Sequence, residues 1–255
     1  MMSKGFIIGA TAGRTTLAGE GLQHQDGNSH LLAYTVPNCV TYDPAYAYEL
    51  AVIIRDGIRR MYEEQEKIFY YVTVMNEKYV QPEMPKGSKE GILKGMYKLK
   101  SSKKRSTKLK VHLLGSGTIL NETLKAHEIL EKDYGVSADV WSVTSYKNLH
   151  LDATNTERWN MLNPGKKAKV PYVAEVTKGE KGVFISASDY VQILGDSISK
   201  WLPGELHSLG TFGFGRSEGG IGRKIAPIDR PIGHQQRRTV PVGQLCIRRS
   251  DGGRL

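Results

Sequence analysis

Residues 13–27 form a glycine-rich stretch in which a carboxylate, Glu20, precedes an imidazole, His24, by four positions. The stretch follows a short apolar run, residues 5–9, that is typical of a β-strand. Loops after strands often carry the chemistry of α/β proteins, because the sheet fixes the ends of the loop. A histidine that can be neutral or charged near neutral pH, beside a carboxylate, suits proton transfer. On spacing alone, a surface turn explains the same residues.

Five further segments follow this stretch in a recognisable order. The six segments are residues 13–27, 36–49, 111–117, 131–136, 157–162 and 213–217. Together they resemble the homodimeric-type decarboxylating first component of the bacterial pyruvate dehydrogenase complex. The resemblance covers residues 3–218, and members of that family are several times longer than this chain. It implies a truncated C-terminal piece that we expect to be inactive alone.

The resemblance implies an α/β fold with mainly parallel sheets in two domains. Residues 1–80 would be a partial thiamine pyrimidine-binding (transketolase-like) domain, and residues 109–218 a transketolase C-terminal-like domain. Residues 81–108 would link them. Residues 219–255 match nothing in the family and are expected to be a basic tail that is disordered or read out of frame.

The function implied by the resemblance is the thiamine diphosphate-dependent oxidative decarboxylation of pyruvate, with acetyl transfer to a lipoyl group. Glu20 and His24 match the family's active-site glutamate and histidine, and Gln23 and Asp26 match positions that would support them. Thiamine diphosphate and magnesium would serve the complete homodimeric enzyme, and the lipoyl domain of the dihydrolipoyl acetyltransferase would be its partner. The family often has a histidine where Asn28 stands, so His30 alone remains of that pair.

The departures from the family concern the cofactor. The chain lacks the family's diphosphate and metal motif and the first half of its pyrimidine domain, so we expect no cofactor-binding residues and no bound cofactor. A metal site at His24 and His30 is disfavoured, because no cysteine or carboxylate cluster completes it at the usual spacing.

Composition favours a cytoplasmic protein without a membrane span. Two cysteines fit a reducing compartment, the longest apolar runs are far shorter than a span, and no signal peptide precedes residue 6. The net charge of +10 is unevenly spread: residues 219–255 hold eight Lys/Arg against two Asp, or +6, which leaves +4 for the rest.

Apolar periodicity predicts an alternation of strands and helices. Strands are expected at residues 5–9, 68–74, 109–114, 138–143, 172–176, 183–186 and 206–212; helices are expected at 42–62 (capped by Asp43), 121–134 (capped by Asn121) and after a cap at Ser188. In the first helix the apolar residues that recur at helical spacing, and that we expect to form its apolar face, are Ala47, Leu50, Ala51, Ile54, Ile58 and Met61. We also expect the first domain to leave a sheet edge or an apolar face uncovered.

Two segments offer weaker signals. Residues 76–108 are lysine-rich and interrupted by prolines, which favours an irregular, solvated connection over a phosphate-binding stripe. Residues 115–117, Gly-Ser-Gly, lack the third glycine of a dinucleotide-binding fingerprint and favour a tight strand-to-helix turn.

Two other functions stay open at this stage. The chain could be a dimerisation module, in which case Trp159, Trp201 and the tyrosines of residues 42–48 should be exposed. It could instead bind an anionic partner or, less readily, nucleic acid through the basic tail.

Overall fold

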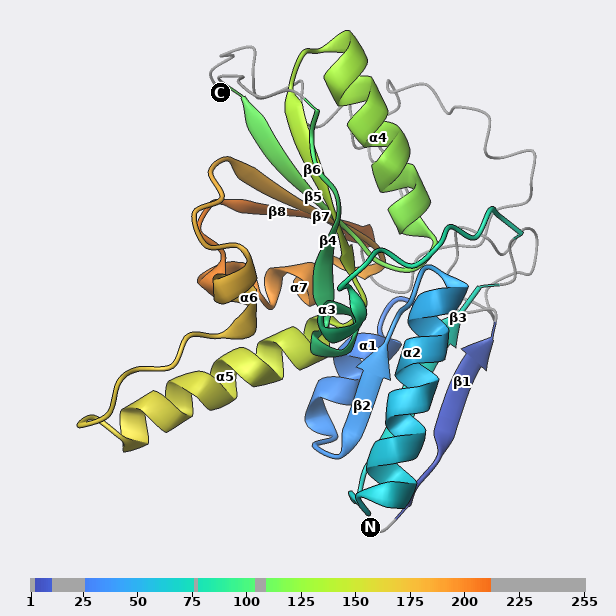
Figure 1. The fold of residues 1–255 in the computed structure, drawn as a ribbon, viewed down its shortest axis with the longest axis vertical. Coiled ribbons are helices and arrows are strands. Elements are labelled where there is room, and N and C mark those ends of the chain that lie inside the picture. The colour runs from blue at the N-terminus through green and yellow to red at the C-terminus, as the bar shows by residue number, and fades with distance from the viewer. Residues whose placement is uncertain (1–2, 11–25, 76–77, 104–108, 212–255) are drawn as a thin grey trace, which may run out of the picture.

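The computed structural model describes residues 3–10, 26–75, 78–103 and 109–211, which form two sheets with covering helices (Figure 1). The strands are β1 Phe6–Ala10, β2 Cys39–Tyr42, β3 Phe69–Val74, β4 Met96–Lys100, β5 Lys110–Gly115, β6 Ser137–Val143, β7 Val183–Val191 and β8 Leu206–Thr211. The helices are α1 Ser29–Leu32, α2 Ala47–Ile58, α3 Lys89–Lys94, α4 Ile119–Asp133, α5 Tyr146–Leu162, α6 Tyr172–Val176 and α7 Gln192–Asp196. Short 3₁₀ turns cover Ala33–Thr35 and Ser199–Trp201, and a π-helical turn, Arg59–Glu63, extends α2.

The first sheet has three parallel strands in the order β1-β3-β2. Helix α2 packs on one face, where Ile53 joins Tyr42, Tyr70 and Val72 in a buried cluster. On the edge strand β1, Ile7 and Ile8 are each 54% exposed. Consecutive side chains of a strand point to opposite faces, so the described residues leave this apolar sheet edge uncovered on both faces, as the sequence predicted.

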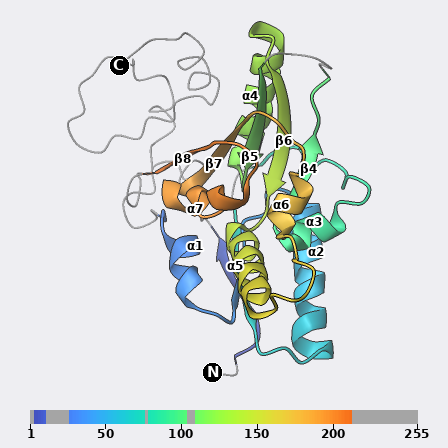
Figure 2. The same ribbon diagram turned by 90° about the vertical axis from the view of Figure 1, so that its left-hand side faces the viewer.

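The second sheet has five strands in the order β4-β6-β5-β7-β8. All neighbours are parallel except β4, which runs antiparallel to β6. Figures 1 and 2 show α4 on one face and α6 and α7 on the other. Every residue of β6 is buried, because helices cover both faces of the sheet. The expected α/β class with mainly parallel sheets is confirmed.

Helix α2 departs from the sequence prediction in its start and in its buried face. It begins at Ala47, and its first turn is satisfied by Glu49, whose Oε2 accepts hydrogen bonds from the backbone N–H groups of Ala45 (2.6 Å) and Tyr46 (3.1 Å). The cap expected at Asp43 was wrong, since that side chain is buried in a different network. The helix buries Glu49, Ile53 and Gly57.

Gly57 explains why the predicted apolar stripe is only partly confirmed, with Met61 buried and Leu50 packed against the core cluster. A Cβ at this position would lie 2.7 Å from the ring of Phe6, so the absence of a side chain lets that ring approach the helix. The face with the smallest residue therefore packs on the sheet, while Ala47 and Ala51 are exposed and Ile58 is 46% exposed.

The segment expected to be an irregular connection contains α3 and the edge strand β4. Lysines are common on edge strands, where they discourage pairing with another chain. Here Lys98 also lies over the ring of Trp141 (4.8 Å to the centroid) and pairs with Asp139 (3.2 Å). A lysine-rich run thus forms a strand because the sheet supplies partners for its charges. The Lys-Lys-Arg tip lies largely outside the described residues.

Three other local predictions in the second half were wrong. Residues 172–176 form helix α6, since a five-residue apolar run fits either structure. Strand β7 continues through Ser188 to Val191, so Ser188 does not cap α7. Helix α4 begins at Ile119, which places Asn121 inside its first turn. The turn at 115–117 is present as expected between β5 and α4.

Besides α3 and β4, the elements α1, β2 and α5 were not predicted. In α5 the buried residues are Tyr146, Lys147, Leu149 and Ala153, all in its first half. The second half extends away from the sheets (Figure 1), so no apolar period marks it in the sequence. Among the described residues, no helix combines the length and the apolar character that a membrane crossing demands.

Candidate functional site

The loop that carries Glu20, Gln23 and His24 lies outside the described residues, but both of its attachments are described. It leaves β1 at Ala10, which pairs with Val74 at the end of β3. It returns at Asp26, whose Oδ1 accepts hydrogen bonds from the backbone N–H groups of Asn28 (3.2 Å) and Ser29 (2.9 Å). The loop is therefore attached at the carboxyl edge of a parallel sheet, where open α/β folds bind ligands.

His30, four residues after Asp26, is buried at this edge. Its Nε2 lies 2.9 Å from Thr73 Oγ1, and its ring meets Tyr190 edge-on at 4.7 Å between centroids. The Thr73 hydroxyl and Asp43 Oδ1 are hydrogen-bonded at 2.6 Å. With Asp43 ionised, the hydroxyl donates to it and has no second proton, so His30 Nε2 donates to Thr73; with Asp43 protonated, the carboxyl group can donate to Thr73 and the hydroxyl to Nε2. The three side chains form a hydrogen-bonded chain from the loop to Asp43.

Asp43 joins the two sheets. Its backbone N–H donates to Thr144 O (2.8 Å), and its carbonyl accepts from Gly117 N–H (3.1 Å). Gly117 has φ +50°, and a Cβ there would lie 2.8 Å from both carboxylate oxygens of Asp43. The turn after β5 thus needs glycine both for its backbone and for the approach of the carboxylate. The carboxyl ends of β2, β3, β5 and β6 meet at this residue.

Burial sets the protonation of the network. It raises the pKa of Asp43 from 3.8 to about 7, against the hydrogen bond from Thr73 and with help from the nearby carboxylates of Asp189 and Asp26. Burial also lowers the pKa of His30 from 6.5 to about 4, with Asp26 acting in the opposite direction. Near neutral pH the network holds a neutral imidazole and an acid that readily keeps a proton.

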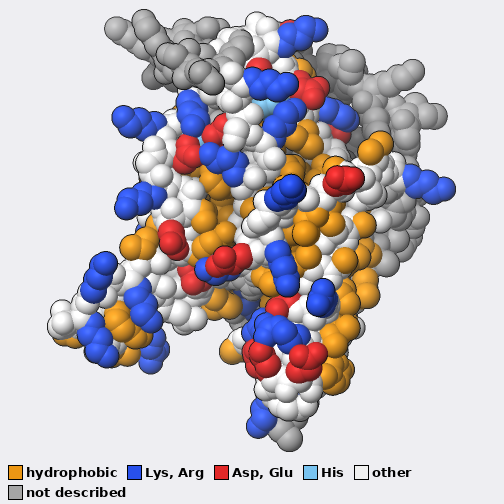
Figure 3. Space-filling model, viewed as in Figure 1, with side chains coloured by type: hydrophobic (Ala, Val, Ile, Leu, Met, Phe, Trp, Pro, Cys, Tyr) orange, Lys and Arg blue, Asp and Glu red, His pale blue; other side chains and the backbone are white. Residues whose placement is uncertain are grey.

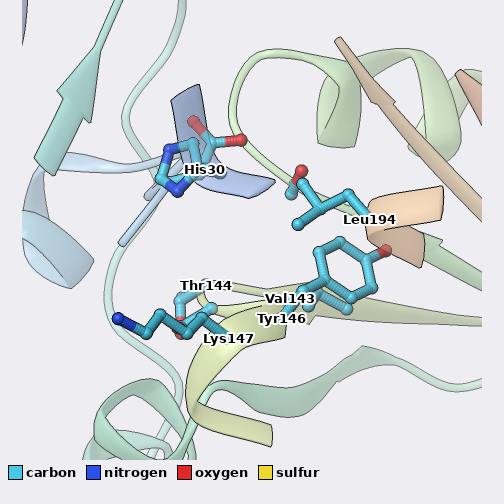
Figure 4. A pocket seen from close by; sticks show the side chains of 9 residues that line it. His30, Val143, Thr144, Tyr146, Lys147 and Leu194 are labelled. Atoms are coloured by element: carbon cyan, nitrogen blue, oxygen red, sulfur yellow. The ribbon is translucent and has the colours of Figure 1, made fainter. Parts of the chain in front are cut away.

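Figure 4 shows the small cavity beside this network, with His30 on one side and Thr144 and Tyr146 on the other. Its volume is about 10 Å³, which admits at most one water molecule. The cavity is far too small for an organic ligand.

Lys147 fixes the segment between His30 and β2. It is buried on α5, and its Nζ donates to the carbonyl oxygens of Ala33 (2.6 Å), Val36 (2.8 Å) and Cys39 (2.5 Å). Burial lowers the pKa of Lys147, while the neighbouring Cys39 thiol acts in the opposite direction. A helix that follows β6 thereby holds in place the chain that leads out of the loop.

Glu49 makes a second connection between the sheets. Its Oε1 accepts hydrogen bonds from Tyr97 Oη on β4 (2.7 Å) and Ser142 Oγ on β6 (2.6 Å). Burial raises the pKa of Glu49, and its hydrogen bonds oppose that shift. Helix α2 is thus hydrogen-bonded directly to the second sheet.

One cluster among the described residues has the composition of a metal site. His112, Asp139 and Glu180 place one ligand atom each within 4.8 Å of one another. Lys110 Nζ lies 3.2 Å from Asp139 and 2.8 Å from Glu180, and Lys98 pairs with the same two carboxylates. Two ammonium groups already balance the two carboxylates, so the cluster is an ion-pair network rather than a cation site.

The described residues do not fit thiamine diphosphate with magnesium. At the carboxyl edge they offer a water-sized cavity and a carboxyl group whose pKa lies near 7. The carboxylates of the ion-pair network are neutralised by lysines. We therefore assign no part of the reaction to a cofactor held by these residues.

The tyrosines expected to be exposed in a dimerisation module are instead internal. Tyr42 is 1% and Tyr46 is 5% exposed, and Tyr48 is half-buried against the core clusters. Trp201 packs against a buried cluster of the second sheet, whereas Trp159 is half-buried in the second half of α5. The tail, on which the anion-binding alternative depends, lies outside the described residues.

The comparisons with solved structures define the class of fold. A transketolase variant from Pichia stipitis superposes with a TM-score of 0.59 at 17% identity, covering 84% of this chain and 26% of that one. A transketolase from Campylobacter jejuni gives 0.58 at 20% identity, covering 84% and 28%. At these identities the likeness concerns the fold alone, a transketolase-like α/β arrangement.

Sequence comparison identifies the family. Residues 1–82 match the model of the pyruvate dehydrogenase E1 component middle domain, and residues 95–221 match the transketolase-like TK C-terminal domain. Pyruvate dehydrogenase E1 components from Pseudomonas aeruginosa and Escherichia coli are 59% identical over 215 residues and 51% identical over 218 residues. The matches cover 84% and 85% of this chain but 24% of each relative. The chain belongs to the pyruvate dehydrogenase E1 component family, as the six segments indicated, and spans about a quarter of the length of these relatives.

Proposed function

We propose that this chain is the C-terminal part of a thiamine diphosphate-dependent pyruvate dehydrogenase component, which decarboxylates pyruvate and transfers the acetyl group to a lipoyl group. Family membership supports the reaction class. The observation that carries the proposal is the attachment of the loop with Glu20 and His24 at the carboxyl edge of a parallel sheet.

Within this proposal, Glu20 and His24 move protons at the substrate, and Gln23 and Asp26 position them. The contacts of Asp26 support a positioning role, since this carboxylate bonds to the backbone at the point where the loop ends. The remaining part of the enzyme supplies the sites for thiamine diphosphate and magnesium. We further propose a cytoplasmic homodimer that meets the lipoyl domain of the dihydrolipoyl acetyltransferase.

Complementation tests the proposal. The chain is mixed with a fragment of the Pseudomonas relative that ends where the matched region begins, together with thiamine diphosphate and magnesium. Release of labelled carbon dioxide from pyruvate and acetylation of a lipoylated domain are measured. We expect no activity from either fragment alone, activity from the mixture, and a loss of about 10²-fold or more with His24→Ala.

The matched control is Lys125→Ala, which removes an exposed side chain on α4 and should leave the activity of the mixture unchanged. Full activity with His24→Ala would show that His24 does not take part in proton transfer. A mixture that associates by gel filtration but releases no carbon dioxide would refute the proposed function.

A further inference from the structure

The second half of α5 and the chain that follows it form a protrusion, which we call the α5 knob and define as residues 158–170. In Figure 3 it lies at the lower left, separate from the body of the molecule, with orange apolar groups among blue cationic ones. Met161 is 73%, Leu162 64% and Val170 61% exposed. Apolar side chains gathered at this exposure mark an interaction site more often than a solvated surface.

The knob is a built structure rather than a loose loop. The side-chain amide of Asn160 donates to Lys169 O (2.9 Å) and its Oδ1 accepts from Lys169 N–H (2.8 Å), which ties the two arms together. The side chain of Asn163 donates to Trp159 O (2.8 Å) and closes the end of the helix. The exposed apolar groups are therefore held in place before any partner arrives, which lowers the entropic cost of binding.

The charge of the knob has a single sign. Its cations are Arg158, Lys166, Lys167 and Lys169, and residues 158–174 contain no Asp or Glu. None of the four forms an ion pair with a residue that the structure describes. The adjacent Glu157 is already engaged by Lys200 (2.7 Å). The electrostatic field at the knob is thus uncompensated and favours an anionic partner.

Two of these cations are fixed over an aromatic ring. The ammonium groups of Lys169 and Lys166 lie 4.1 Å and 5.8 Å from the centre of the Trp159 ring. Cation–π contact of this kind restricts the positions of the two charges on the knob. The Lys169 ammonium group also occupies a position over the ring that a stacked nucleic acid base would need.

We propose that the α5 knob is a docking surface for an acidic segment of a partner protein that also carries apolar side chains. An apolar centre with a polar rim is the usual anatomy of a protein interface, and charges at the rim select the partner and speed its approach. A second knob is not the occupant, since two surfaces of this charge repel each other. The inference does not depend on the reaction proposed above.

Tryptophan side chains provide a local readout, because the chain has three of them. In ¹⁵N-tryptophan-labelled full-length chain, the indole N–H signal of Trp159 reports on the knob, and that of Trp141, which is 2% exposed, reports on the core. The signals are assigned with Trp159→Phe and Trp141→Phe. The probe is a peptide of alternating glutamate and leucine, and its Gln-for-Glu and Ser-for-Leu versions are the comparison probes.

We expect the acidic peptide to shift the Trp159 signal saturably and to leave the Trp141 signal in place. Neither comparison peptide should do so at the same concentration. The charge reversal Lys166→Glu/Lys167→Glu/Lys169→Glu and the apolar variant Met161→Ser/Leu162→Ser should each weaken binding by about tenfold or more. The control Lys67→Glu/Lys132→Glu/Lys178→Glu reverses three exposed charges elsewhere and should change binding by less than about twofold.

Several outcomes would overturn the proposal. One is a peptide that binds by fluorescence anisotropy without moving the Trp159 signal, which would place the binding elsewhere, for example on the basic tail. Others are equal weakening by the control, the absence of peptide binding, or a Trp159 response to phosphatidylglycerol vesicles or oligothymidylate but not to the peptide. Self-association that the apolar variant abolishes would assign the surface to a second copy of the chain.

Discussion

The opposed shifts of Asp43 and His30 predict how the stability of this protein responds to pH. The perturbations are Asp43→Asn and His30→Gln, separately and together. Both substitutions keep a hydrogen-bonding group next to Thr73 and remove one titration each. Because both side chains bond to Thr73, the variants together test the hydrogen-bonded chain from His30 to Asp43.

The sign of each effect follows from its pKa. The folded protein holds the Asp43 proton more tightly than the unfolded chain does, so this group lowers stability as the pH rises from about 4 to about 7. The folded protein holds a His30 proton less tightly, so this group lowers stability as the pH falls from 6.5 to about 4. At about 1.4 kcal/mol per pKa unit, the effects amount to about 4 kcal/mol for Asp43 and about 3 kcal/mol for His30.

The two contributions oppose each other over the same range and nearly cancel in the wild-type chain. We expect Asp43→Asn to lose about 3 kcal/mol of unfolding free energy, relative to its value near pH 6.5, on acidification to about pH 4. We expect His30→Gln to lose about 4 kcal/mol in the other direction, as the pH rises from about 4 to about 7. The double variant should regain the flat profile of the wild type.

Urea denaturation followed by tryptophan fluorescence, repeated across this pH range, measures these profiles. The informative quantity is the difference between a variant and the wild type, because the other titrating groups are common to all four proteins. Profiles that stay parallel within about 1 kcal/mol would refute the reasoning, since they would mean that neither group is held in the protonation state described here.

Further predictions concern single buried groups. Glu49→Ala should cost about 3–5 kcal/mol of unfolding free energy, because it leaves two hydroxyls and two backbone N–H groups without their acceptor. In urea denaturation the control Glu63→Ala, at an exposed position, should leave the midpoint unchanged. Equal midpoints for the two variants would contradict the prediction. Lys147→Met should cost about 2–4 kcal/mol, because three buried carbonyls lose their donor; a loss below about 1 kcal/mol in the same assay would show that water replaces the ammonium group. Burial raises the pKa of the Cys39 thiol, so iodoacetamide should modify Cys39 only after unfolding. Peptide mass spectrometry follows the modification. A rate in the native chain equal to that in the unfolded chain would contradict this prediction.

Much of the fold can be predicted from the sequence where one element buries one kind of side chain. Strands β3, β5 and β6 are rich in apolar residues because helices or neighbouring strands cover them, and their expected bounds differ from the observed ones by one residue. The prediction fails where the packing of an element depends on side chains that another element of the chain supplies. The contact of the Phe6 ring with Gly57 determines which face of α2 is buried. The lysine-rich β4 forms a strand because carboxylates distant in the sequence, such as Asp139, pair with its charges.

The candidate site divides in the same way. Glu20 and His24 are found through resemblance to a family, since their spacing alone also fits a surface turn. The chain from His30 through Thr73 to Asp43 has no signature in the sequence, because its members are 43 and 30 positions apart. An aspartate before a proline and a helix is typical of a helix cap. The sequence around Asp43 therefore predicts a cap and gives no sign of its bonds to both sheets.

The segment that leads from β1 to α1 is attached to both sheets at its described ends, to β3 at Ala10 and to β7 at Gly27. Thr73 of the first sheet holds Asp43 through its side chain, and Thr144 and Gly117 of the second sheet region hold it through its backbone. The backbone N–H of Val191, at the end of β7, donates to Gly27 O (2.9 Å) where the loop returns. A change in the orientation of the second sheet would therefore move the end of the loop directly. The second sheet thus holds the point at which the chain returns after Glu20 and His24, although it contributes neither residue.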